Sequence, residues 1–251
     1  MDEQVQRLAK HLWEKLQDTP KSKRRLIAIS GIPGSGKTTL AAKVTTQLNK
    51  KWRGDSPALA SDPGIATFVP MDGFHLTRAQ LSAMPDPNTA HKRRGAAFTF
   101  DSDAYFELVK KLRQPLVPEL RTIYAPSFDH SVKDPVADDI PIAPSSRIVL
   151  LEGNYLALNK GKWKESAELM DELWFVEAST ETARKRLIRR HVESGVAANE
   201  EEAVKRVDES DLLNAKEIIE GRLEVNEMIP SIEDPKWAPE NQVIDKERDG
   251  L

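Results

Sequence analysis

The stretch RLIAISGIPGSGKTTL, residues 25–40, decides the fold of this chain. A short apolar run leads into Gly31-x-x-x-x-Gly36-Lys37-Thr38, and a helix-compatible segment follows. This order of strand, glycine-rich turn and helix is typical of a phosphate-binding P-loop. The glycines let backbone N–H groups point at phosphate oxygens, and the new helix presents the positive end of its dipole to the same anion. The segment therefore predicts a nucleoside triphosphate site.

Two side chains of this loop carry chemistry of their own. Lys37 is long enough to reach the β- and γ-phosphates, and the hydroxyl of Thr38 is a ligand for Mg²⁺. ATP and Mg²⁺ are the cofactors we expect. The plain alternative is a glycine-rich turn with a surface lysine, and the flanking strand and helix argue against it. The predicted ATP-binding residues are Gly31, Pro33, Gly34, Ser35, Gly36, Lys37, Thr38 and Thr39.

Length and composition exclude several classes of protein. A chain of 251 residues fits one α/β domain, or a core domain with an appended lid. The formal net charge of −3 argues against binding to nucleic acid through charge, and the absence of cysteine excludes disulfides and thiolate chemistry. No apolar run approaches the roughly 20 residues that span a bilayer, and the N-terminus lacks a signal-peptide pattern. We expect no membrane partner and a cytoplasmic location.

Hydrophobic periodicity predicts alternating strands and helices along the chain. Apolar residues at helical spacing predict an amphipathic helix over 3–18, and Pro20 ends it. Many prolines and little periodicity over 115–146 indicate irregular structure or short strands. The expected strands are 25–30, 66–71, 147–152 and 173–178, and the main expected helices are 39–50, 103–113, 163–170, 180–192 and 199–220. The stretch 51–66 is expected to be a loop, and Val243-Ile244 is the only β-like pair of the tail.

Alternation of this kind predicts an α/β fold, the three-layer αβα arrangement of P-loop NTPases with a mostly parallel sheet and a helical lid. Ligands of such sheets bind at the carboxyl ends of the strands. Asp72 ends the second strand and Glu152 ends the third, so both carboxylates are expected beside the P-loop. This expected grouping is the main structural inference from the sequence.

The two strand-end carboxylates match needs of phosphoryl transfer. Asp72 is placed to accept a proton from a hydroxyl, and Gly73 provides the turn that exposes it. Glu152 is placed to hold Mg²⁺ through water. A turn or capping role for Asp72 and a solvated strand end for Glu152 are the plain alternatives.

A basic helix over 180–192 supplies cations for the same chemistry. Arg186 and Arg190 are four residues apart and share one face of this helix. Mobile cations of this kind neutralise charge on a transferring phosphoryl group. A solvated basic surface is the alternative. GTPases usually recognise guanine through an Asn-Lys-x-Asp motif. Neither Asn-Lys pair of this chain is followed by Asp at the required spacing, so we do not expect a GTP switch.

At residues 24–220 the chain resembles the uridine kinase, pantothenate kinase and phosphoribulokinase group of P-loop kinases, and within it the pantothenate-kinase-like and fructose-transport-kinase-like proteins. The resemblance is carried by GIPGSGKTTLA, VPMDGFHLTRAQL, RRGAAFTFD, YAPSFDHSVKDP, IVLLEGNYLAL and RKRLIRRHVESG. It implies that Asp72 is the catalytic base, that Glu152 is the Walker B carboxylate, and that Arg186 and Arg190 are lid arginines. Where uridine kinases have Asp-Ser-Phe-Tyr this chain has Asp-Gly-Phe-His, which leaves the identity of the acceptor open.

The resemblance also implies an acceptor-binding insertion at about 76–146 and a lid at about 180–198, within a single kinase domain of residues 1–251. Arg94, Tyr124, Phe128 and His130 fall where the family binds its acceptor. His75 is placed either to contact the acceptor or to serve packing and capping, and Phe74 and Phe128 either flank a planar acceptor or belong to the core. The predicted acceptor-binding residues are Asp72, Phe74, His75, Arg94, Tyr124, Phe128 and His130; the predicted catalytic residues are Lys37, Asp72, Arg186 and Arg190; the predicted metal ligands are Thr38 and Glu152.

The sequence thus predicts an ATP-dependent kinase that phosphorylates a hydroxyl of a small metabolite: a nucleoside, a vitamin precursor or a sugar. Two other functions stay open. One is a partner-regulated P-loop ATPase or assembly factor without a small acceptor, and the other is a pseudo-enzyme that binds nucleotide for regulation. A homodimer is expected only by analogy with the family.

Overall fold

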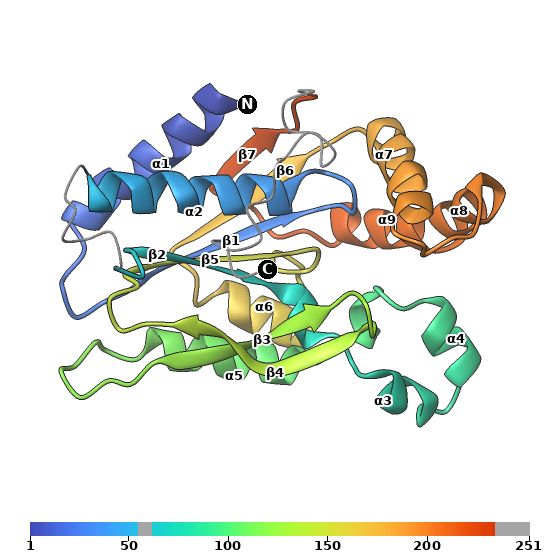
Figure 1. Ribbon diagram of the computed structural model, residues 1–251, viewed down its shortest axis with the longest axis horizontal. Coiled ribbons are helices and arrows are strands. Elements are labelled where there is room, and N and C mark those ends of the chain that lie inside the picture. The colour runs from blue at the N-terminus through green and yellow to red at the C-terminus, as the bar shows by residue number, and fades with distance from the viewer. Residues whose placement is uncertain (55–61, 234–251) are drawn as a thin grey trace.

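The computed structural model describes residues 1–54 and 62–233, and its centre is a five-stranded parallel sheet (Figure 1). The order of the strands is β2-β5-β1-β6-β7, so the strand that precedes the P-loop is the middle one. Central parallel strands are buried on both faces, which explains why they read as continuous apolar runs. The strands are β1 (Arg25–Gly31), β2 (Ala66–Pro70), β5 (Ile148–Gly153), β6 (Glu172–Glu177) and β7 (Glu227–Pro230).

Helices cover the sheet on both faces and complete a three-layer αβα fold, as the sequence predicts. Alternate residues of β1 point to opposite sides: Ile27 and Ile29 pack in the cluster formed with α1 and α2, whereas Leu26 and Ala28 pack in the cluster formed with α5 and α6. This alternation follows from the period of two along a strand. The helices of the two layers are α1 (Asp2–Gln17) and α2 (Lys37–Arg53) on one side, and α5 (Ser102–Arg113) and α6 (Gly161–Ala167) on the other.

The N-terminal helix α1 agrees with the expected helix over 3–18. Its buried residues recur on one face and include Leu8 and Leu12, which pack on the α2 side of the sheet. Burial of such a stripe provides most of the stability of an amphipathic helix. The helix therefore belongs to the core of the domain and does not stand apart from it.

A two-stranded antiparallel hairpin, β3 (Ile123–Asp129) and β4 (Asp134–Ile142), occupies the stretch expected to be irregular or short β. The register shifts between Ala125 and Ser127, so Pro126 sits at an irregularity where no ladder hydrogen bond is required. Prolines are compatible with such a hairpin because each of its strands has an unpaired edge. The hairpin packs on the short 3₁₀ helix Met71–Phe74 (η2), which follows β2.

Two other elements differ from the sequence expectations. The short strand β7 was not expected, and only Ile229 of it is buried, so it lacks a periodic signal. The expected helix over 199–220 is interrupted by one π-helical turn at Val207–Asp211 between α8 and α9. The remaining helices are α3 (Arg78–Ser82), α4 (Pro87–Lys92), α7 (Thr180–Glu193), α8 (Glu200–Arg206) and α9 (Leu212–Glu220).

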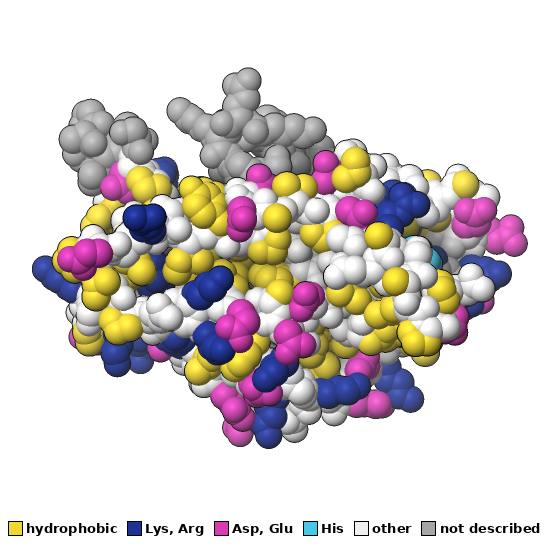
Figure 2. Space-filling view, turned by 90° about the horizontal axis from the view of Figure 1, so that it is seen from below, with side chains coloured by type: hydrophobic (Ala, Val, Ile, Leu, Met, Phe, Trp, Pro, Cys, Tyr) yellow, Lys and Arg dark blue, Asp and Glu magenta, His cyan; other side chains and the backbone are white. Residues whose placement is uncertain are grey.

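Some expectations fall outside the described residues. The pair Val243-Ile244 lies outside them, and so do residues 55–61 of the expected loop, while α2 extends to Arg53. Among the helices that the structure describes, none combines the length and apolarity required to cross a bilayer. On the face seen from below, Lys and Arg side chains are intermixed with Asp and Glu side chains (Figure 2).

Candidate nucleotide and phosphoryl-transfer site

The P-loop joins the carboxyl end of β1 to the first turn of α2, and its glycines have backbone conformations that side chains disfavour. Gly34 has a φ of 78° and Gly36 a φ of 89°, and Gly36 is the residue that caps α2. A Cβ atom at Gly34 would lie 2.8 Å from the backbone oxygen of Ala183. The loop is therefore closely packed against helix α7.

The register of the sheet brings the expected carboxylates to the P-loop edge. Glu152 pairs with Ile29 on one side and with Pro70 on the other. Asp72 follows two residues after Pro70 in η2. The P-loop, Glu152 and Asp72 consequently lie at neighbouring strand ends, which is the position where parallel sheets bind their ligands.

Lys37 and Glu152 form a buried ion pair at this edge. The Lys37 Nζ atom lies 3.7 Å from Glu152 Oε1, and Nζ also donates a long hydrogen bond of 3.5 Å to the backbone oxygen of Ile32. Burial lowers the pKa of Lys37, and the carboxylates of Glu152 and Asp72 oppose this effect. Burial raises the pKa of Glu152 to about 7, although Lys37 and the Thr38 hydroxyl favour its charged form. Burial thus disfavours the charged form of both members of the pair.

The oxygen atoms near Lys37 also fit a magnesium ion. Thr38 and Glu152 offer a hydroxyl and a carboxylate beside the phosphate-binding loop, and their side chains interact with each other. Across the described ranges, no group of three or more His, Asp or Glu side chains is arranged to hold a metal by itself. Mg²⁺ typically binds through one or two protein ligands, waters and the phosphates of a nucleotide. The donor set therefore fits a metal that binds together with a nucleotide.

Asp72 faces the same site from η2, and its side chain is 51% exposed. Its charge acts on both Lys37 and Glu152, which places all three groups within one electrostatic environment. The 3₁₀ helix η2 packs closely on strand β3, because a Cβ atom at Gly73 would lie 2.1 Å from the backbone oxygen of Pro126. His75 completes the turn by donating from Nδ1 to the backbone oxygen of Asp72 over 2.8 Å. The carboxylate is therefore accessible on a rigid support.

Arg186 and Arg190, the two arginines of α7 expected to act on phosphate, differ in their contacts. Arg190 acts electrostatically on Lys37 and Glu152. Its backbone oxygen accepts from Ser194, but its guanidinium makes no hydrogen bond or ion pair within the described ranges. Arg186 donates from Nη1 to the backbone oxygen of Gly34 over 3.2 Å and to Ser231 Oγ over 2.8 Å. Arg190 thus influences the buried ion pair through its charge, whereas Arg186 is hydrogen-bonded to the P-loop.

Four of the expected acceptor residues form one aromatic and cationic cluster next to Asp72: His75, Arg94, Phe128 and His130. The ring of His75 lies 4.9 Å from that of Phe128, and Phe128 lies 5.2 Å from His130. Arg94 lies over the Phe128 ring at 5.4 Å. Its guanidinium already donates to Asp134 and to two backbone oxygens, so Arg94 braces the hairpin against the segment that follows η2.

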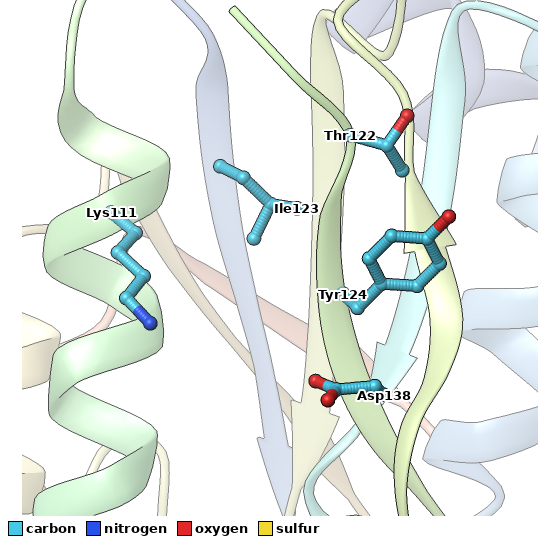
Figure 3. A pocket seen from close by; sticks show the side chains of 5 residues that line it. All are labelled: Lys111, Thr122, Ile123, Tyr124 and Asp138. Atoms are coloured by element: carbon cyan, nitrogen blue, oxygen red, sulfur yellow. The ribbon is translucent and has the colours of Figure 1, made fainter.

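The other expected acceptor residues are placed differently. Phe74 is 4% exposed and packs edge-on against Tyr105 with ring centroids 5.3 Å apart, which favours the core interpretation. Tyr124 is half-exposed and lines a cavity of about 500 Å³ between α5 and the hairpin, together with Lys111 and Asp138 (Figure 3). An adjoining cavity of about 390 Å³ is lined by Tyr124, Phe74 and His75 among others. His75 is therefore the residue shared by the cluster and this cavity.

Ser231 is a residue of this site that sequence reasoning missed. Its hydroxyl accepts from Arg186 and donates to the backbone oxygen of Ser35 over 2.8 Å. No sequence motif predicts this role. Ser231 follows the short strand β7, and the position of that strand becomes clear only from its pairing in the sheet. The fold and these side chains define the class of the protein: a P-loop protein with a nucleoside triphosphate site.

Comparisons with known proteins narrow this class. A protein of Aspergillus versicolor named ATP-dependent kinase-like protein notR' is 53% identical over 160 residues, 64% of this chain and 93% of that protein. A Schizosaccharomyces pombe protein, provisionally named a uridine kinase, is 40% identical over 191 residues, 76% of either chain. The crystal structure of a Silicibacter protein, strain TM1040, provisionally named a fructose transport system kinase, covers 90% of this chain and 98% of its own with 29% identity and a TM-score of 0.73.

A family model described as NB-ARC domain matches residues 2–54, a minor part of the chain that includes the whole P-loop. The chain belongs to the family of P-loop kinases that includes the ATP-dependent kinase-like and uridine-kinase-named relatives. The resemblance to the uridine kinase group of P-loop kinases, inferred from the sequence motifs, is therefore confirmed.

Proposed function

We propose that this protein transfers the γ-phosphoryl group of ATP to a hydroxyl group of a small nucleoside-, vitamin- or sugar-like metabolite. One observation carries the proposal: a half-exposed carboxylate, Asp72, shares an electrostatic site with the buried Lys37–Glu152 pair of the P-loop. A base, a phosphate-binding cation and a metal-binding carboxylate at one sheet edge are the parts that phosphoryl transfer requires.

In the proposed reaction the acceptor hydroxyl lies next to Asp72, which accepts its proton. The acceptor oxygen forms a bond to the γ-phosphorus as the bond from that phosphorus to the bridging oxygen breaks, and ADP leaves. Lys37 and the P-loop amides hold the phosphate oxygens, and Arg190 offsets the charge that develops on them. Thr38 and Glu152 would hold Mg²⁺, which neutralises charge on the β- and γ-phosphates.

The contacts next to Asp72 support an acceptor with a planar or apolar part. His75 donates from Nδ1, so its Nε2 atom is left as a hydrogen-bond acceptor, and the rings of Phe128 and His130 lie beside it. We propose these three side chains as acceptor contacts. Arg94 would act on the acceptor through the hairpin that it braces. A cytoplasmic location and a homodimer stay predictions from the sequence and from family analogy.

The first test is a screen of hydroxylated metabolites for ADP release, with the phosphorylated product identified by mass spectrometry. Asp72→Asn is then expected to lower the transfer rate by about 10²–10⁴-fold, the usual contribution of a general base. ATP affinity should stay within about twofold, because the carboxylate is not part of the P-loop. Asp103→Asn, an exposed carboxylate on α5, is the matched control.

Transfer by Asp72→Asn at the wild-type rate would contradict the assignment of the base. ATP hydrolysis without any phosphorylated metabolite, at a rate that depends on a protein partner, would contradict the kinase proposal and favour a partner-regulated ATPase.

A further inference from the structure

We propose that Ser231 is a positioning residue of the nucleotide site, which holds Arg186 on the P-loop before a nucleotide binds. The hydroxyl of Ser231 lies between two groups of that site: Arg186 donates to it over 2.8 Å, and it donates to the backbone oxygen of Ser35 over 2.8 Å. This inference rests on the proposed function only in requiring that the P-loop binds ATP.

The backbone of Ser231 is fixed independently of the lid. Ser231 follows the last residue of β7, which pairs in parallel with β6, and its N–H donates to the backbone oxygen of Glu177 over 2.7 Å. The Ser231 side chain is therefore attached to backbone that is hydrogen-bonded to the central sheet. A bond to a rigid partner removes more of the rotational freedom of an arginine than a bond to another flexible side chain.

Two side chains bond to neighbouring carbonyl groups of the P-loop in this arrangement. Arg186 donates to the oxygen of Gly34, and Ser231 donates to the oxygen of the next residue, Ser35. Ser231 Oγ also lies 3.9 Å from the position of a Cβ atom at Gly36. Carbonyl groups held in this way leave the N–H groups of the loop oriented to the other side, where phosphate oxygens bind.

Arg186 is otherwise weakly held, which makes Ser231 important for its position. Its ion pair with Glu233 is long, 3.8 Å, and the Glu233 side chain is 73% exposed. Exposed pairs of this kind contribute little. The short bonds of Arg186 are thus those to the P-loop and to Ser231, and loss of the hydroxyl should release the guanidinium from the loop.

The experiment measures equilibrium binding of Mg·ATP to the full chain by calorimetry, without any acceptor. Ser231→Ala is expected to raise the Kd for ATP about tenfold, equivalent to about 1.4 kcal/mol. Ser231→Thr keeps the hydroxyl and should restore affinity to near that of the wild type. Ser194→Ala removes a hydroxyl at the end of the same lid helix, where it bonds only to a backbone oxygen of the helix, and should leave the Kd unchanged.

A double-mutant cycle separates positioning from a general structural effect. If Ser231 acts through Arg186, Ser231→Ala has little further effect on ATP affinity in the Arg186→Ala background. Additive losses, or a Ser231→Ala protein that binds ATP as the wild type does, would overturn the inference and leave the kinase proposal intact. A wild-type protein that binds no ATP would overturn both.

Discussion

The ammonium group of Lys37 and the carboxylate of Glu152 face each other at 3.7 Å, and less than a tenth of either residue is exposed. Burial disfavours the charged form of both groups, because each loses water that would otherwise solvate it. A buried pair of this kind is weak support for stability. We propose instead that Lys37 binds phosphate and that Glu152 helps to bind Mg²⁺.

Glu152→Gln should remove the dependence of ATP binding on Mg²⁺. The amide keeps the size of the side chain but loses the charge that a metal requires. We expect the wild type to bind ATP more tightly with Mg²⁺ than with a chelator, and the variant to bind it with nearly equal affinity in both conditions. Titration calorimetry measures this difference.

Glu177→Gln is the matched control, because Glu177 also ends a strand of the sheet but is exposed. If Glu152→Gln keeps the full effect of Mg²⁺, the metal is held by other groups.

Arg190→Ala should lower the rate of phosphoryl transfer by about 10²–10³-fold and change ATP affinity much less. The reason is that a cation directed at developing charge contributes mainly in the transition state. Steady-state kinetics with the acceptor found in the metabolite screen measure the two effects separately. Lys185→Ala removes a cation from an exposed position of the same helix and should leave the rate of phosphoryl transfer unchanged. An equal loss in both variants would mean that only the overall charge of the helix matters.

Gly73→Ala should impair both folding stability and catalysis, because its Cβ atom would collide with the backbone oxygen of Pro126 at 2.1 Å. The hairpin or η2 must move, at a cost of about 1–3 kcal/mol. Because Asp72 precedes this glycine, we expect the transfer rate to fall at least about tenfold. Chemical denaturation and kinetics measure the two effects.

Gly161→Ala provides the comparison for this collision. It introduces a Cβ atom with nothing within 4 Å but with a φ of 50°, so strain of about 1–2 kcal/mol should lower stability and spare catalysis. A Gly73→Ala protein with a normal transfer rate would show that the support behind Asp72 is not required.

His75 should contribute a loss of stability on acidification below pH 6.5, opposite in sign to the contribution of Glu152, whose pKa is raised to about 7. Burial lowers the pKa of this ring from 6.5, and Arg94 and His130 add to the effect, while Asp72 opposes it. The unfolded chain therefore takes up a proton at a higher pH than the folded protein does. The stabilising contribution is complete above pH 6.5 and declines as the pH falls toward the lower pKa of the folded state.

His75→Phe should reduce this pH dependence, because the variant keeps an aromatic ring and loses the titrating group. Unfolding free energies of both proteins at pH 7.5 and pH 5.0 give the two slopes. Equal slopes would show that His75 does not contribute to the loss of stability in acid.

Local patterns were sufficient for much of the fold. The apolar run before Gly31 predicts a buried strand, and the stripe that contains Leu8 and Leu12 predicts the first helix, because burial on both faces and burial on one face leave different periodicities. The strand β7 and the hairpin could not be predicted with the same certainty. The first is short with one buried side chain, and the second contains prolines that also occur in irregular segments.

The sequence by itself determined the P-loop and the two strand-end carboxylates, because each depends on a few neighbouring residues and on the rule that parallel strands present their carboxyl ends together. Only the tertiary structure decided the different positions of Arg186 and Arg190, the bracing role of Arg94 and the presence of Ser231 beside the loop. Those relationships join segments that are up to 196 residues apart, and the contact between Ser231 and Ser35 arises from the packing of the sheet and not from any local pattern.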